Sequence, residues 1–177
     1  MKGAPPTPRP RPPAAPETPL RDALAAYLAD NGFTTRAYEE NIAKLGFFGL
    51  PVWIPNTPGR KRGLPLHDLH HVALGFGTDL VGECEISAWE LRAGARGFGP
   101  FVLFLITQAA VMGLVLSPRR TLAAWRAARG CRSLYAAGVW PEDVLSLTVG
   151  ELRAMLGVHA PPVSGARHDS RECATPS

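Results

Sequence analysis

This sequence of 177 residues has few cysteines and no segment that resembles a secretion signal. The three cysteines, Cys84, Cys131 and Cys173, are far apart, so no C-x-x-C pair is available for a metal. No apolar segment of the kind that targets a chain for secretion follows Lys2. An odd number of cysteines without a secretion signal predicts a cytoplasmic protein with reduced thiols, and argues against a disulfide scaffold.

Large apolar residues are missing from both ends. Residues 1–19 contain eight prolines and no large apolar side chain after Met1, and residues 159–177 are polar with little periodicity. Such segments cannot bury enough surface to offset the entropy lost on ordering. We therefore expect a disordered Pro-rich arm at 1–19, a single domain at 20–158 and a disordered tail at 159–177.

The chain also lacks a nucleic-acid-binding signature. Its net charge of +4 comes from scattered basic residues, among them Arg60 to Arg62 and five arginines between Arg119 and Arg132. No basic and aromatic module accompanies them, so we expect no nucleic-acid partner. An anionic lipid or phosphate partner and ordinary solvated helix faces both remain open.

The remaining pattern is helical and predicts an all-α fold. Leu20, Ala23, Leu24, Tyr27 and Leu28 repeat at helical spacing, and Asn31-Gly32 marks a helix end. Residues 47–65 are rich in glycine and proline and predict an irregular or short extended connection. Further helices are expected after Pro65 and over residues 78–94, 119–138 and 141–157.

An uncharged run extends from Phe98 to Leu116, with Arg96 before it and Arg119 and Arg120 after it. Its nineteen residues reach the length of a membrane span, but Gly99-Pro100, Gln108 and the basic residues on both sides argue against one. We expect a long apolar central helix. A buried core helix and a helix lining a groove for a prenyl tail at a bilayer surface are both compatible with it.

Three of the five histidines lie between His67 and Glu83. On one helix, His67 and His71 project from the same face one turn apart, which allows both rings to meet one cation. Asp68 can join that face or orient a ring, and His70 is a third candidate. Glu83 follows His71 closely enough to return a carboxylate. Such a set suits zinc, iron(II), manganese or cobalt, and the alternative is a polar helix end.

The motif H-D-x-x-H-x11-E, present as His67, Asp68, His71 and Glu83, resembles the signature of the Coq4 family of ubiquinone-biosynthesis proteins. The similarity extends through "HDLHHVALGFGTDLVGECEISAWE" and the C-terminal half, about residues 64–158. The first 60 residues do not match the family. The resemblance implies a Zn²⁺ site, with Fe²⁺ as the alternative, and the metal ligands His67, Asp68, His71 and Glu83.

The resemblance also implies an activity. Coq4 proteins replace the ring carboxylate of a polyprenylated 4-hydroxybenzoate-type precursor with a hydroxyl, which is the work of a metal-dependent decarboxylase (lyase) and hydroxylase. It implies quinone-biosynthesis enzymes as partners and peripheral contact with a membrane. Asp68 and Glu90 are the candidates for proton transfer. Two alternatives are a non-catalytic scaffold that presents a prenylated lipid and a relative recruited to a secondary-metabolite pathway.

Overall fold

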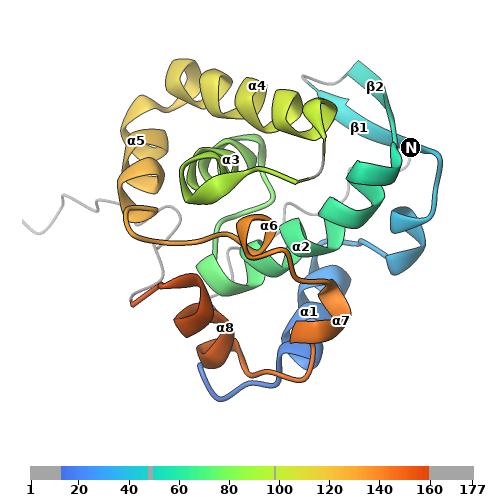
Figure 1. Ribbon diagram of the computed structural model, residues 1–177. Coiled ribbons are helices and arrows are strands. Elements are labelled where there is room, and N and C mark those ends of the chain that lie inside the picture. Colours follow the sequence, from blue (N-terminus) through green and yellow to red (C-terminus); the bar gives the residue numbers. More distant parts are fainter. Residues whose placement is uncertain (1–12, 48–49, 98, 160–177) are drawn as a thin grey trace, which may run out of the picture.

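The computed structural model describes residues 13–47, 50–97 and 99–159, and its elements are shown in Figure 1. These ranges form α1 (Leu20–Asp30), the 3-10 helix η1 (Thr35–Tyr38), β1 (Ile42–Phe47), β2 (Leu50–Pro55), α2 (Pro58–Leu74), α3 (Leu80–Gly94), α4 (Pro100–Leu116), α5 (Pro118–Ala127), α6 (Leu134–Ala137), α7 (Pro141–Val144) and α8 (Val149–Leu156). The predicted helical character is confirmed. The antiparallel hairpin β1–β2 is the exception among the described residues, and it occupies part of the expected extended connection.

Helix α3 lies in the middle of the domain (Figure 1), where it packs against α4, α5 and α6. Helix α2 packs against α1, α6 and α8. The core contains completely buried side chains from both helices, including Leu69, Ile86 and Trp89. The two helices that hold the motif residues are therefore fixed by packing on several sides.

The apolar run forms α4, but the expectation of a long apolar helix at the centre is wrong. The helix has 17 residues and lies at the edge of the domain, while α3 is central (Figure 1). Only Val102, Ile106, Ala110 and Gly113 are buried, and the opposite face is exposed. Among the residues that the structure describes, no helix combines the length and the apolarity needed to cross a bilayer. Phe98 lies outside the described residues.

Helix α2 begins at Pro58, well before the start that the sequence predicts after Pro65. The Thr57 hydroxyl accepts a hydrogen bond from the Arg60 amide at 3.3 Å, and Pro58 occupies the first helical position, where proline is well tolerated. Pro65 itself lies inside the helix. Capping at Thr57 and the packing of α2 outweigh the cost of that proline.

Two predicted helices are each divided. The basic segment 119–138 forms α5 and α6, separated by Gly130 at φ 80° and by Ser133, whose hydroxyl accepts from the Ala136 amide. The segment 141–157 forms α7 and α8, because Thr148 and Glu151 form a capping box that starts a new helix. The sequence periodicity continued across both breaks and concealed them.

The end of the Pro-rich arm belongs to the domain. The Pro16 carbonyl accepts from the Gly150 amide at 2.7 Å and the Thr18 carbonyl from the Val149 amide at 2.9 Å, which joins this segment to the start of α8. The segment 15–19, which we predicted to be part of a disordered arm, is therefore held to the domain by backbone hydrogen bonds. The rest of the predicted arm (1–12) and the predicted tail after His159 lie outside the described residues.

Candidate metal centre

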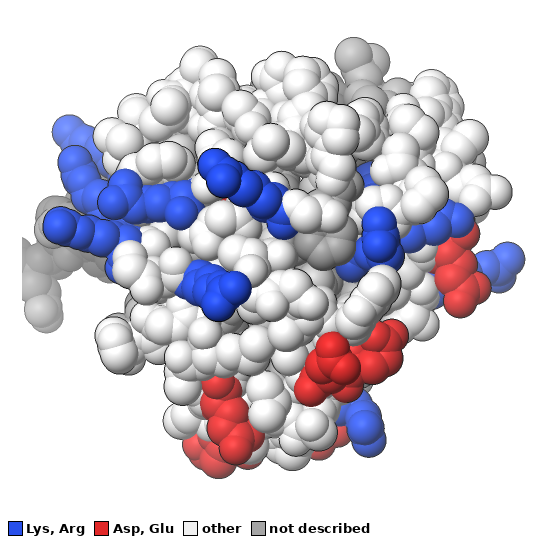
Figure 2. All heavy atoms as spheres, viewed as in Figure 1, with Lys and Arg blue, Asp and Glu red and all other residues white. Residues whose placement is uncertain are grey.

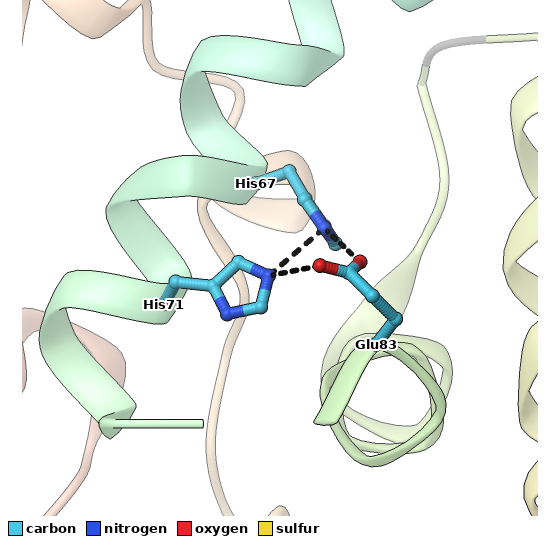
Figure 3. A group of neighbouring side chains, drawn as sticks. All are labelled: His67, His71 and Glu83. Atoms are coloured by element: carbon cyan, nitrogen blue, oxygen red, sulfur yellow. Dashed lines mark hydrogen bonds and ion pairs between the residues drawn. The ribbon is translucent and has the colours of Figure 1, made fainter. Parts of the chain in front are cut away.

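Three side chains from α2 and α3 point toward one another (Figure 3). The Nε2 atoms of His67 and His71 lie 3.2 Å apart. The Glu83 carboxylate places one oxygen 3.1 Å from His67 Nε2 and the other 3.3 Å from His71 Nε2. One ligand atom from each residue lies within 4.8 Å of the others, so the three atoms can share one ion. The predicted grouping of these three residues is what the structure shows.

The outer nitrogens of both rings already have partners. His67 Nδ1 lies 3.0 Å from an oxygen of Glu90, and His71 Nδ1 lies 3.0 Å from the Phe76 carbonyl oxygen. Because a carbonyl oxygen accepts and cannot donate, His71 Nδ1 carries a hydrogen. With a hydrogen on Nδ1 of each neutral ring, both Nε2 lone pairs face the Glu83 carboxylate. Three acceptors converge on one point, which is an arrangement that a cation stabilises.

The turn between α2 and α3 sets this geometry. Gly75 ends α2 at φ 75°, a conformation that glycine adopts at low cost, and the next carbonyl accepts from His71. The Asp79 side chain caps α3 by accepting from the Gly82 amide at 2.7 Å. A Cβ at position 82 would lie 2.1 Å from the Gly77 carbonyl oxygen, so the backbone passes there only because residue 82 is glycine. Glu83 follows directly.

The site opens to solvent on one side. The His71 side chain is completely buried, the His67 side chain is 18% exposed and the Glu83 side chain is 38% exposed. Two imidazoles and one carboxylate are the ligand set of many catalytic zinc sites and of non-haem iron(II) sites. The donors present therefore fit the metal that the resemblance implies, and the exposure leaves room for a further ligand.

Asp68 is not one of the three grouped ligands. Its carboxylate is buried and accepts a hydrogen bond from the Tyr38 hydroxyl at 2.5 Å. Burial raises the pKa of Asp68 and outweighs the opposing effects of His67 and of the Tyr38 hydrogen bond. The structure thus gives Asp68 a partner outside the metal site, and a role as a ligand stays a prediction.

Glu90, the other candidate for proton transfer, is completely buried. One of its oxygens bridges His67 Nδ1 at 3.0 Å and His70 Nδ1 at 2.7 Å. A carboxylate in this position orients a ligating ring and raises its basicity. His70, the third candidate ligand, is directed away from the cluster, because its Nε2 accepts from the Leu134 amide.

The charges of the cluster stabilise one another. Burial alone would lower the pKa of His67, but the charges and hydrogen bonds of Glu90 and Glu83 raise it well above its ordinary value. Burial alone would raise the pKa of Glu83, but His71 and His67 lower it to about 2. Without a metal, the site therefore holds a proton on His67 between anionic carboxylates. A divalent cation held by His67, His71 and Glu83 would replace that proton with a larger positive charge.

Two tyrosines complete the surroundings. The Tyr27 ring stacks on His71 with centroids 5.6 Å apart and planes 22° apart, and Tyr38 binds Asp68. The sequence identifies Tyr27 only as part of the apolar repeat of α1. Tyr38 lies 30 residues before Asp68 in a short helix without a motif, so no local signal in the sequence could have identified it.

Comparisons of this chain with models of protein families, with curated proteins and with solved structures gave no match. The resemblance to the Coq4 family therefore rests on the motif residues themselves and remains a prediction. What the structure adds is independent of it: His67, His71 and Glu83 come together in space.

Proposed function

We propose that His67, His71 and Glu83 bind one divalent ion, zinc ahead of iron(II), and that the chain is a Coq4-like enzyme of ubiquinone biosynthesis. The observation that carries the proposal is the convergence of two Nε2 atoms and a carboxylate within 4.8 Å. The motif is the basis for proposing the Coq4 family. The exposed side of the cluster supports a catalytic role for the metal over a purely structural one. A closed site with four protein ligands would instead favour a scaffold.

The proposed substrate is a polyprenylated 4-hydroxybenzoate-type acid, and the reaction replaces its ring carboxylate with a hydroxyl. The ring loses two electrons as carbon dioxide leaves and a hydroxyl from water takes its place. We assign dioxygen as the acceptor of these two electrons, with hydrogen peroxide as the other product. A bound divalent ion supplies positive charge that stabilises the carboxylate or the phenolate of such a substrate.

The chain's own residues then have separate tasks. Asp68 is the candidate for holding a proton near the site, because burial raises its pKa and Tyr38 fixes one of its oxygens. Glu90 is completely buried and bridges two rings, so in this proposal it orients His67. That assignment replaces proton transfer as the expected task of Glu90.

We also propose that α4 and the start of α5 rest on an anionic membrane surface, from which a prenylated substrate is taken. Exposed apolar side chains cover this face, which we call the α4 face: Leu103, Phe104, Val111, Leu114, Val115, Leu116 and Leu122. Val115 is 80% exposed, and contiguous apolar exposure of this kind marks an interaction surface.

The charge distribution matches that orientation. In Figure 2 the upper part of the molecule, over α4, is free of charged residues, and lysines and arginines form a band below it. The acidic residues visible in this view lie at the level of this band, at the right edge, or below it. An apolar face bordered by arginines fits the interface of an anionic bilayer. Quinone-biosynthesis enzymes at the same membrane are the proposed protein partners.

Complementation tests the proposed function. A strain that lacks its own enzyme for the ring-carboxylate replacement should regain quinone when it expresses this chain. Glu83→Ala should abolish the rescue, because the carboxylate ligand is lost, and His159→Ala should not, because that residue lies outside the site. Rescue by the double variant His67→Ala, His71→Ala would contradict a metal-dependent activity. Rescue that needs the protein but not Glu83 would support the scaffold instead.

A further inference from the structure

We propose that His70 is a positioning residue of the metal centre, which fixes Glu90 and, through it, the orientation and tautomer of His67. The inference rests on the proposed metal site and adds a residue that lies behind it. The chain of contacts runs from the backbone of α6 to His70, then to Glu90, then to His67.

His70 is completely buried, and its surroundings hold the ring in one orientation. Its ring packs against Trp89 with centroids 5.4 Å apart and against Tyr135, edge to face, with centroids 5.0 Å apart. Its Nε2 lies 3.0 Å from the Leu134 amide nitrogen. Both ring nitrogens have partners, so the ring has neither space nor a free atom with which to bind a metal.

The Leu134 amide sets the tautomer of His70. A backbone N–H can only donate, so Nε2 of His70 must carry a lone pair. The hydrogen of the neutral ring is then on Nδ1, and it points at Glu90 Oε1, 2.7 Å away. Leu134 is the first residue of α6, where amides have no partner within the helix, so this one is available to His70.

The same oxygen of Glu90 serves both histidines. His67 Nδ1 lies 3.0 Å from Oε1, so His70 and His67 both donate to one atom. A fixed acceptor keeps the His67 hydrogen on Nδ1 and leaves Nε2 free for an ion. If that hydrogen moved to Nε2, it would point at His71 Nε2, 3.2 Å away, and block the site.

The contacts from Leu134 through His70 and Glu90 to His67, which we call the relay, also connect three helices. Ser133 is bound to the end of α3, because its amide donates to the Ala93 carbonyl at 3.1 Å and its hydroxyl donates to the Gly94 carbonyl. The next residue, Leu134, holds His70 on α2. The distance between the helices that supply the ligands is therefore set in part by α6.

The test uses two substitutions of His70 in the full chain. His70→Phe keeps a ring but removes both hydrogen bonds, and we expect zinc affinity to fall about 10–100-fold, as for loss of other partners of ligating histidines. His70→Gln keeps a donor and an acceptor and should recover most of the affinity. Thr121→Val is the matched control, because Thr121 is buried and its hydroxyl donates to the Ser117 carbonyl, a hydrogen bond that has no part in the contacts of His70 or Glu90.

Three measurements distinguish positioning from general loss of structure. Competition with a chromophoric chelator gives the zinc affinity of each variant, and circular dichroism shows that each is folded. Long-range ¹⁵N–¹H spectra of the metal-free wild type give the tautomers directly. They should show hydrogen on Nδ1 of His70 and none on Nε2, and in the zinc-bound wild type hydrogen on Nδ1 of His67.

The outcomes separate this inference from the proposed metal site. Wild-type affinity in folded His70→Phe, or a hydrogen on Nε2 of His70 in the wild type, would overturn it. If His70→Phe does not fold, the wild-type spectra decide. A wild type that binds no zinc overturns the metal site, while the tautomer of His70 still reports on the relay.

Discussion

The Nε2 atoms of His67 and His71 lie 3.2 Å apart, and when both rings are neutral neither has a hydrogen on Nε2 to donate to the other. The two outer nitrogens are bound to Glu90 and to the Phe76 carbonyl oxygen. Two facing lone pairs repel each other unless a proton or a metal ion lies between them. The nearby carboxylate of Glu83 makes a positive charge at this point still more favourable.

Zinc affinity should fall as the pH is lowered, and it should do so even above pH 7. In the metal-free chain the pKa of His67 lies well above its ordinary value of 6.5, so zinc must displace a proton there at neutral pH. Below that pKa, each pH unit should weaken binding about tenfold. Glu83, with a pKa of about 2, stays charged throughout and adds no proton release.

Isothermal titration in two buffers of different ionisation enthalpy measures the protons released. We expect about one proton per zinc near pH 7.5 from His67. A histidine with its ordinary pKa would already be neutral at pH 7.5 and would release almost no protons when zinc binds. Zinc binding without proton release at that pH would contradict the arrangement of His67 between Glu90 and Glu83.

Gly82→Ala should damage both the fold and the site. The added Cβ would lie 2.1 Å from the Gly77 carbonyl oxygen, and a backbone atom cannot move aside as a flexible side chain can. We expect the free energy of unfolding to fall by about 2 kcal/mol, measured by urea denaturation, together with weaker zinc binding, because Glu83 is the next residue.

Gly130→Ala is the control for that substitution. Gly130 has φ 80° and no atom within 4 Å of an added Cβ, so alanine meets only backbone strain of about 1 kcal/mol. Its zinc affinity should be unchanged. Equal zinc affinity in the Gly82→Ala variant would show that the close approach to Gly77 does not position Glu83.

The α4 face should bind vesicles that contain phosphatidylserine. Val115→Glu should abolish binding, because it places a charge at a side chain that is 80% exposed on this face. Replacing Arg119, at the start of α5, by glutamine should weaken binding roughly fivefold, from about 1 kcal/mol for an arginine near an anionic surface. Sedimentation with vesicles measures both effects.

Met155→Glu provides the comparison on the opposite side of the molecule. Met155 is 40% exposed on α8, far in the sequence from the α4 face. The Met155→Glu substitution should leave vesicle binding intact. If Val115→Glu and Met155→Glu bind equally well, then α4 is not the surface that contacts lipid.

The grouping of His67, His71 and Glu83 could be predicted from the sequence because its geometry is local, whereas the predicted inclusion of Asp68 is not seen. His67 and His71 are one helical turn apart, and the glycines after Leu74 indicate the turn that returns Glu83. Helix ends at Asn31 and Gly94 could be predicted for the same reason, since the residues at each end determine them. Local patterns are sufficient where neighbours along the chain make the contact.

The surroundings of the ligands could not be predicted, because they depend on contacts between distant residues. His70 meets the amide of Leu134, 64 residues later, and Asp68 meets Tyr38, 30 residues earlier. The division of α5 from α6 depends on a cap at Ser133 that competes with continued helical periodicity. Likewise, α4 is the more apolar helix but lies at the edge. Helix α3 is central because it packs against α4, α5 and α6, and its sequence alone does not indicate these contacts.

The metal content of the purified chain tests the central claim most directly. Elemental analysis of protein prepared without chelators should find about one zinc ion per chain in the wild type and in His159→Ala. His71→Ala and Glu83→Ala should each retain less than about a tenth of that amount, because two ligands no longer hold the ion at protein concentrations in the micromolar range. A folded wild type that contains no divalent metal and takes up none when zinc or iron(II) is added would contradict the account.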